Sequence, residues 1–209
     1  SNIAHQLKTP ITAISLSAQM MEEHPSRDYL AQIHKQLGRL THLEEALLLL
    51  SRLDAGILPL KMEAVDVYTA VSLAADNLQE VFEAAGLSVD ISEMGEMKIL
   101  ADLDWTMEAL MNLFKNCAEY TPPGGRIHCA CSQNPLYTEI ILWDEGKGFD
   151  KEDIPHLFER FYRGKNASGN GIGIGLSLAR EIIERQNGTI RAVNLPGKGA
   201  AFEIRFYSH

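Results

Sequence analysis

The chain has 209 residues, of which 45% are hydrophobic and 22% are charged, as in globular proteins of one ordinary domain or two small ones. This composition excludes collagen-like, disordered and disulfide-scaffold proteins. Apolar runs stay far below the ~20 residues that span a bilayer, and no signal-peptide pattern opens the sequence. We therefore expect no membrane-spanning segment within it.

Charge and cysteine content narrow the function further. A formal charge of −9 disfavours general nucleic-acid binding, because phosphate contacts need clustered Lys and Arg. Residues 1–62 hold six basic and six acidic side chains, whereas residues 63–209 hold 13 basic and 22 acidic ones, so two regions with different roles are expected. Cys117, Cys129 and Cys131 form no C-x-x-C pair and cannot all be bridged, which favours free thiols in a reducing compartment.

Residues 1–53 predict two helices joined by a short turn. Apolar residues recur at steps of three and four in two stripes, separated by the helix-breaking Pro25. A pair of helices buries only one seam of each, so we expect this hairpin to dimerise into a four-helix bundle. The stripes are Ile3, Leu7, Ile11, Ile14, Ala18 and Met21, and then Leu30, Ile33, Leu37, Leu40, Leu43, Leu47 and Leu50.

The pattern changes after a linker at residues 54–62, which contains Gly56 and Pro59. From residue 63 to residue 209, strand-like and helix-like periods alternate, which predicts an α/β sandwich with helices packed on a mixed sheet. The whole chain is therefore expected to be an α+β protein. The expected helices are 67–85, 104–119 and 174–186, and the expected strands are 87–91, 98–101, 126–132, 138–144, 189–194 and 200–206.

His5 is a candidate nucleophile on the first helix. At about 100° per residue it lies about 200° round the helix from both Ile3 and Leu7, so it faces away from the apolar stripe. Thr9, four residues on, shares its face. An exposed neutral imidazole is available for nucleophilic attack. Taken alone, however, His5 is more simply a surface histidine beside an incidental proline, Pro10.

Two glycine-rich segments are candidate phosphate-binding turns. Asp144-Glu145-Gly146-Lys147-Gly148 follows an expected strand, and residues 169–176, GNGIGIGL, lead directly into an expected helix. Such turns expose backbone N–H groups, which favour phosphate at a helix N-terminus. Neither the dinucleotide fingerprint G-x-G-x-x-G nor the P-loop G-x-x-x-x-G-K-[ST] is present. The simpler alternative is a tight hairpin and a helix cap.

A polar stripe marks the expected helix 104–119. Glu108, Asn112 and Asn116 are spaced i, i+4, i+8 and share one face, while Leu110 and Phe114 lie on the other. Amide oxygens are suitable ligands for a Mg²⁺ ion that keeps water and nucleotide phosphate. A solvated helix face is the alternative for this stripe alone, but the order of the several signals along the chain is difficult to obtain by chance.

That order resembles the sensor histidine kinases of two-component systems. Residues 4–10, AHQLKTP, resemble the phospho-acceptor box of that family, residues 112–118, NLFKNCA, its asparagine box, and residues 157–163, LFERFYR, its phenylalanine box. The two glycine boxes are matched by Asp144-x-Gly146-x-Gly148 and by Gly171-x-Gly173-x-Gly175-Leu176. Because the linker and the closing hairpin also fit, the resemblance covers essentially the whole chain.

The resemblance implies ATP and Mg²⁺ as ligands, and a role for each matched position. Asn116 would hold Mg²⁺ with help from Asn112, Asp144 would accept the adenine amino group, and Tyr120 would stack near the base. The glycine-box residues Gly146, Gly148, Gly171, Gly173, Gly175 and Leu176 would shape the nucleotide pocket. Arg163 and Lys165 would face the γ-phosphate, and residues 164–170 would form a short ATP lid.

The same resemblance implies the reaction and its partners. His5 would attack the γ-phosphorus, and the phosphoryl group would then pass to an aspartate on a response regulator. Thr9 matches the family position linked to dephosphorylation of that regulator, so phosphatase activity is a second hypothesis. The sequence starts four residues before His5, where such kinases carry a further helix, a transmembrane span and a sensor. We therefore expect the cytoplasmic portion of a membrane receptor, present as a fragment.

Two positions depart from the family pattern. The residue after the histidine is usually acidic and can take the imidazole proton, but here it is Gln6, an amide that orients without acting as a base. General-base help is typically worth ~10²–10⁴-fold, so we expect slow autophosphorylation. Glu119 stands where many relatives place Lys against a phosphate, so its charge should weaken that contact or point elsewhere.

Two other classes compete with a kinase. ATP-hydrolysing conformational machines such as gyrase share the nucleotide fold, but they carry a glutamate for water activation where this chain has Asn112, and they lack a histidine-bearing hairpin. A catalytically weak or inactive nucleotide-binding scaffold is favoured by Gln6 alone. The sequence therefore favours phosphoryl transfer over hydrolysis.

Overall fold

The structure is a computed structural model that describes residues 3–165 and 171–208, and the chain divides into two compact units. The first contains the described residues up to Leu58 together with residues 171–174, and the second begins at Pro59. The division at Leu58 lies inside the segment 54–62 that the sequence predicts as a linker. Within the described residues, no helix combines the length and the apolar character that crossing a bilayer requires.

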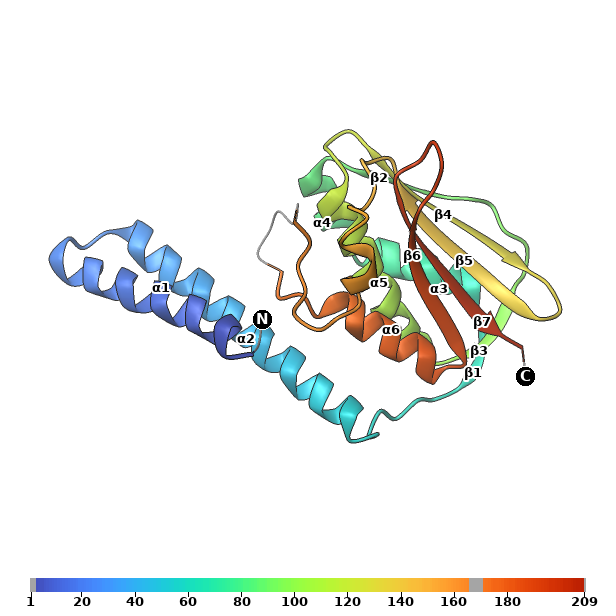
Figure 1. Ribbon diagram of the computed structural model, residues 1–209, viewed down its shortest axis with the longest axis horizontal. Coiled ribbons are helices and arrows are strands. Elements are labelled where there is room, and N and C mark those ends of the chain that lie inside the picture. The colour runs from blue at the N-terminus through green and yellow to red at the C-terminus, as the bar shows by residue number, and fades with distance from the viewer. Residues whose placement is uncertain (1–2, 166–170, 209) are drawn as a thin grey trace. The chain divides into compact units, whose positions relative to one another are not determined.

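The first unit is a helical hairpin, which confirms the predicted fold of this region (Figure 1). Helix α1 spans Ile3–Glu23 and α2 spans Arg27–Asp54. Ser26 caps the start of α2, since its backbone is extended and its hydroxyl accepts a hydrogen bond from the Asp28 N–H, at 3.2 Å. Asp28 also places a negative charge in the first turn of α2, where the helix dipole favours it.

The apolar stripes of the hairpin are only partly covered within one chain. On α1, Leu7 and Ile14 are half-buried and Pro10 is buried, but Ile3 and Ile11 remain 43% and 50% exposed. This partial burial agrees with the expectation that a pair of helices buries only one seam of each. Exposed large apolar side chains on both helices are what a second hairpin would cover in a four-helix bundle. They are Ile3, Ile11, Leu16, Leu30, Leu37 and Leu48.

The second unit is built on a five-stranded sheet in the order β2-β4-β5-β7-β6, beside a two-stranded sheet of β1 and β3. Strand β2 runs parallel to β4, and the other neighbouring strands are antiparallel, which confirms the predicted mixed sheet. The strands are β1 (Glu63–Asp66), β2 (Ser88–Ile91), β3 (Lys98–Ala101), β4 (Arg126–Gln133), β5 (Tyr137–Asp144), β6 (Gly188–Asn194) and β7 (Ala200–Tyr207).

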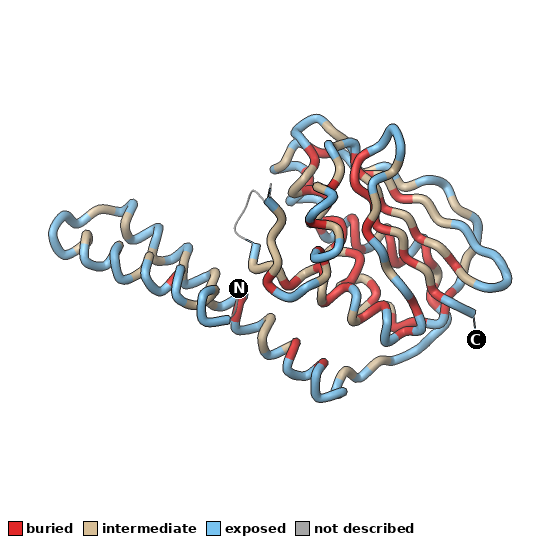
Figure 2. The backbone as a smooth tube through the Cα atoms, viewed as in Figure 1, coloured by how far each residue is buried: buried red, intermediate tan, exposed pale blue. Residues whose placement is uncertain are grey.

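Helices cover one face of the five-stranded sheet (Figure 1). They are α3 (Val67–Asp76), α4 (Gln79–Ala85), α5 (Leu103–Tyr120) and α6 (Gly175–Arg185), with a short 3₁₀ helix η1 at Ile154–His156. Burial alternates along β5, where Thr138, Ile140, Leu142 and Asp144 are buried and the residues between them are half-buried. The core of this unit, red in Figure 2, therefore lies between the helices and one face of the sheet.

The predicted helix 67–85 is wrong, because the chain forms two helices there. Helix α3 ends at Asp76 and α4 begins at Gln79. Between them the Leu78 N–H bonds to the Ala75 carbonyl three residues back, and the Leu78 side chain is buried. The apolar spacing continues across this break, so the pattern could not reveal it. The short elements β1 and η1 were also not predicted, since three or four residues carry little periodicity.

Candidate functional site

Helix α5 carries three of the candidate site residues on one side. Asp102 caps the helix, since its carboxylate accepts the Trp105 N–H at 2.9 Å. The Asp102 N–H in turn donates to Gln186 Oε1, at 2.6 Å, just beyond the end of α6. These bonds fix α5 against α6. Asn112, Asn116 and Tyr120 then follow at steps of four and are all half-buried.

The Asn112 amide has a defined orientation. Its Nδ2 donates to the Glu108 carbonyl, at 2.9 Å, so the amide oxygen points away from that turn of the helix. A Cβ atom on Gly175 would lie 2.8 Å from this oxygen, too close for any other residue type without a shift. The Asn112 oxygen therefore lies at the first residue of α6, and a side chain at position 175 would displace it.

Asp144, at the end of β5, is the most unusual polar group of the domain. Its side chain is 1% exposed, and Oδ1 accepts two backbone N–H groups, from Gly146 at 2.9 Å and from Ala200 at 3.2 Å. Among the residues that the structure describes, its second oxygen, Oδ2, has no hydrogen-bond partner although it is buried. Burial raises the pKa of Asp144, and the two N–H bonds partly oppose that rise.

Glycines line the space around Asp144. A Cβ atom on Gly199 would overlap Asp144 Oδ1, and one on Gly146 would lie 2.8 Å from the Tyr120 carbonyl oxygen. Gly148 has a φ of +86°, which glycine adopts readily, and a Cβ there would lie 2.6 Å from Asn194 Oδ1. The backbone thus approaches Asp144 closely from two loops. Side chains are excluded from the space around its carboxylate, which we call the cradle.

Asn194, which the sequence pattern did not identify as a site residue, holds the loop after β5 in place. Its Oδ1 accepts the Phe149 N–H at 2.7 Å, and its Nδ2 donates to the Phe149 carbonyl at 2.9 Å. This pair of bonds resembles a short β-ladder made by a side chain. The only sequence signal is an amide at the end of a strand, which is too common to single out.

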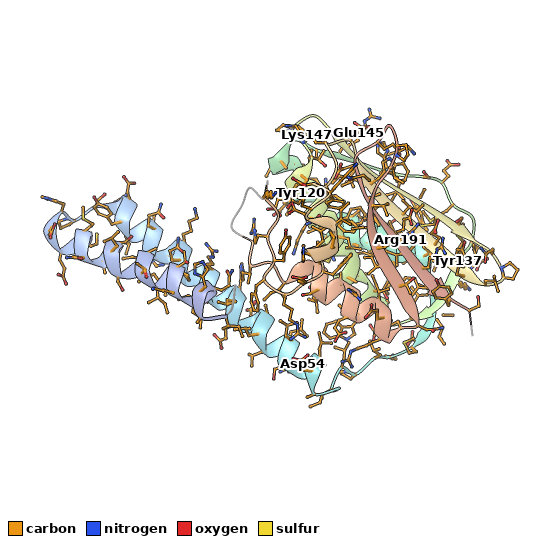
Figure 3. The ribbon with its side chains drawn as sticks, in the orientation of Figure 1. Asp54, Tyr120, Tyr137, Glu145, Lys147 and Arg191 are labelled. Carbon is orange, nitrogen blue, oxygen red and sulfur yellow. The ribbon has the colours of Figure 1, made fainter. Side chains whose placement is uncertain are left out.

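A cavity of about 390 Å³ lies between the end of α5 and the loop after β5. Its walls combine apolar and charged groups, including Tyr120, Phe149 and Leu157 with Glu119, Lys147 and Asp153. The rings of Tyr120 and Phe149 meet edge to face, with centroids 6.4 Å apart. Burial raises the pKa of Tyr120, and the Glu119 charge adds to that effect. Tyr120 and Lys147 are labelled in Figure 3. The cavity offers an aromatic wall beside charged groups.

The segment that follows η1 brings a guanidinium to this region. Arg163 Nη2 lies 2.8 Å from Glu119 Oε1, so Glu119 turns to Arg163. Lys165 behaves differently, since its ammonium group pairs with Glu152 in an exposed ion pair. The structure therefore places the Arg163 side chain, and not that of Lys165, beside the cavity wall. Of the expected lid, residues 166–170 lie outside the described residues.

Asp153 anchors both ends of the short stretch that contains Arg163. It is 5% exposed, accepts the Tyr162 hydroxyl at 2.6 Å, and accepts the Lys165 N–H at 3.2 Å. A Cβ on Gly164 would lie 2.8 Å from Asp153 Oδ2, so a side chain there would push this carboxylate from its place. The hydrogen bond to Asp153 raises the pKa of Tyr162 to about 12. Neither anchor could be read from the spacing of residues.

The hairpin unit presents the candidate phospho-acceptor. His5 is exposed, as predicted, and Thr9 Oγ1 donates to the His5 carbonyl at 3.3 Å, which places both residues on one face of α1. Gln6 is half-buried.

In the second glycine box, Gly173 has a φ of +86° and Leu176 is buried on the first turn of α6. Gly171 belongs to the described residues and is exposed.

The residues present suit a magnesium ion that shares its coordination with a substrate. Within residues 3–165 and 171–208, no cluster of three or more His, Cys, Asp or Glu side chains is arranged to hold a metal. The amide oxygens of Asn112 and Asn116 are hard, neutral ligands. They could supply one or two positions of an octahedral Mg²⁺ site, with water and phosphate oxygens in the others.

Two family models match parts of the chain that lie on either side of the division at Leu58. Residues 101–208 match the family described as "Histidine kinase-, DNA gyrase B-, and HSP90-like ATPase", and residues 1–56 match the "His Kinase A (phospho-acceptor) domain". The chain belongs to the histidine kinases of bacterial two-component systems. This confirms the family and the fold that the sequence motifs predicted.

Individual histidine kinases resemble the chain over nearly all of its length. It is 33% identical to "Sensor protein SphS" of Synechococcus elongatus over 97% of this chain and 52% of that protein. It is 32% identical to "Swarming motility regulation sensor protein RssA" of Serratia marcescens, over 98% and 45%. The solved structure of Acinetobacter baumannii histidine kinase AdeS has a TM-score of 0.79 at 25% identity, and covers 99% of this chain and 98% of that one. The chain spans about half the length of these two curated relatives.

Proposed function

We propose that this chain is the catalytic core of an ATP-dependent histidine kinase, which phosphorylates His5 and passes the phosphoryl group to a response regulator. The observation that carries the proposal is the buried Oδ2 atom of Asp144, which has no donor among the described residues. A buried carboxylate oxygen without a donor is costly, and glycines keep other side chains out of the cradle. The exocyclic amino group of adenine would supply the missing hydrogen bond.

The second unit would bind the nucleotide through three kinds of contact. Asp144 would accept the adenine amino group, and Tyr120 would lie against the base. Asn116, helped by Asn112, would hold Mg²⁺, which neutralises the developing charge on the phosphates when bound. Arg163 would stabilise the negative charge on the transferred group. The glycine residues of both boxes let the backbone approach the nucleotide closely.

The phosphoryl step needs little covalent chemistry from the protein. A ring nitrogen of His5 attacks the γ-phosphorus in line, so that the new N–P bond forms as the bond to the ADP oxygen breaks. The imidazole proton must then leave. Gln6 can orient the ring but cannot accept that proton as a normal base, so water would have to receive it. This predicts a slow first step.

We further propose that the phosphoryl group passes to an aspartate of a response regulator, and that the hairpin forms a homodimer. Membership of the histidine kinase family supports both partners, and the exposed apolar stripe supports the dimer. The whole protein would then be a membrane sensor whose cytoplasmic part includes this chain. Thr9, which shares the exposed face of His5, is the candidate for regulator dephosphorylation. Loss of that activity in Thr9→Ala, with His5 labelling retained, would support this role, and an unchanged rate would exclude it.

Labelling with γ-labelled ATP tests the reaction. Wild-type protein should acquire an acid-labile, alkali-stable label that is absent from His5→Gln, while His24→Gln, a control on the same hairpin, should keep it. ATP turnover without a label would instead indicate a hydrolysing machine. Nucleotide binding without label or turnover would indicate a scaffold, which Gln6 alone favours.

A further inference from the structure

Glu119 and Arg163 form an ion pair between two segments that are distant in the sequence. Glu119 lies in the last turn of α5, and Arg163 lies in the segment after η1. Their closest atoms are 2.8 Å apart, and the side chains are only 27% and 23% exposed. A pair with this burial is screened far less than the exposed pairs elsewhere on the domain.

One partner of this pair belongs to the wall of the candidate nucleotide cavity, and the other lies beside that wall. Glu119 lines the cavity, and the charges of both Glu119 and Arg163 act on Tyr120, the aromatic residue of the same wall. Burial raises the pKa of Glu119, and the Arg163 charge opposes that rise, so the guanidinium helps to keep the carboxylate ionised. Each partner therefore stabilises the charge of the other at this position.

A guanidinium binds a carboxylate and a phosphate with the same fork of N–H donors. A nucleotide phosphate that enters the cavity would therefore compete with Glu119 for Arg163. The competition differs from that at Asp144, where the hydrogen-bonding position is not taken by the described part of the chain. At Arg163, the Glu119 carboxylate already binds the guanidinium that a phosphate would bind.

We propose that Glu119 is a positioning residue that acts as an internal substitute for phosphate, holding Arg163 until ATP displaces it. This inference rests on the proposed nucleotide binding and adds a regulatory step to it. Glu119 lowers the affinity for phosphorylated nucleotides, because the ion pair must break before Arg163 can bind a phosphate. It also keeps Arg163 folded against α5 while no nucleotide is bound.

We call the Glu119–Arg163 pair, which ATP must open, the latch. A double-mutant cycle with three ligands tests it. Calorimetry would compare the affinities for adenosine and ATP in wild type, Glu119→Gln, Arg163→Gln and the double variant. Glu119→Gln should bind ATP about fivefold more tightly, which equals about 1 kcal/mol, and should bind adenosine as wild type does. Measurements with ADP show whether the second phosphate is enough to displace Glu119. Glu63→Gln, which breaks the exposed pair with Lys61, is the matched control and should change neither affinity.

Simple repulsion between Glu119 and phosphate would give the same single-variant result, but it would persist without Arg163. The latch instead requires that Glu119→Gln no longer tightens ATP binding in the Arg163→Gln background. A gain that persists there, an equal gain for adenosine, or no gain overturns the latch. If the cycle behaves as expected while His5 takes no label, the latch stands and the kinase reaction falls. If wild type binds no adenine nucleotide, both fall.

Discussion

Replacing Asp144 with Asn changes one buried atom and should change which base the proposed nucleotide site accepts. Oδ1 of Asp144 receives the N–H groups of Gly146 and Ala200. An Asn side chain must keep its oxygen at that position, because the opposite rotamer would point its amino group at two donors. Its NH₂ group would then replace Oδ2 and face the adenine amino group. The Asn NH₂ group and the adenine amino group are both donors, so the hydrogen bond that Asp144 Oδ2 would accept in wild type is lost.

The size of the effect follows from the kind of hydrogen bond that is lost. A bond to an ionised group contributes roughly 1.5–3 kcal/mol, and an unpaired buried donor adds a further cost. Asp144→Asn should therefore weaken ATP binding by roughly 10- to 100-fold. A purine nucleoside triphosphate without the 6-amino group never makes this bond, so its affinity should hardly change between the two proteins.

Competition calorimetry with ATP and the 6-unsubstituted analogue measures this difference directly. Wild type should prefer ATP by at least tenfold, and Asp144→Asn should lose the preference. Asp90→Asn, an exposed aspartate on β2, is the control for the loss of one negative charge. Equal affinity of wild type for the two nucleotides, or an equal loss for both in Asp144→Asn, would show that Oδ2 does not select the base.

Three further outcomes are expected. Gly199→Ala should lower both the melting temperature and ATP affinity, because its Cβ overlaps Asp144 Oδ1 and overpacking costs about 1–3 kcal/mol, whereas Gly95→Ala, in open space, should be near neutral in both measurements. Gln6→Glu should raise the initial rate of His5 labelling by about tenfold or more by supplying a general base, and an unchanged rate would contradict that explanation. Burial raises the folded-state pKa of Asp144, so its contribution to stability is present below the unfolded pKa and is lost as pH rises through the folded pKa. Asp144→Asn should accordingly flatten this part of the pH dependence measured by denaturant unfolding, and an unaltered curve would contradict the assigned shift.

Local patterns predicted most elements of the second unit. The strand at residues 98–101 has the predicted bounds, and α5 differs from its expected range by one residue at each end. Both are set by nearby signals, alternating burial in the strand and an Asp102 cap before the helix. The break before α4 was missed for the opposite reason. It depends on Leu78 packing into the core, while the helical spacing of apolar residues continues unchanged.

The site residues likewise include some that the sequence reveals and some that it does not. The motif spacing indicated Asp144 and the asparagines of α5, because their chemistry is visible in the residue types. The partners that complete the site are distant in the chain, as Asn194 is 45 residues from Phe149 and Arg163 is 44 residues from Glu119. No periodicity connects such residues. The antiparallel pairing of β5 with β7 brings the start of β7 beside Asp144 and so supplies the Ala200 N–H, whereas the Gly146 N–H comes from the adjoining turn.

The two ends of the site would then contribute to binding in different ways. At Asp144 the described residues leave a buried acceptor without a donor, a cost that a base with an amino group would remove. At Arg163 the chain supplies its own counter-ion, so phosphate gains only the difference between its interaction and that of Glu119. Adenosine should therefore retain a large share of the binding free energy of ATP. The phosphates would act mainly by exchanging partners with Arg163, whose backbone neighbours Tyr162 and Lys165 stay anchored to Asp153.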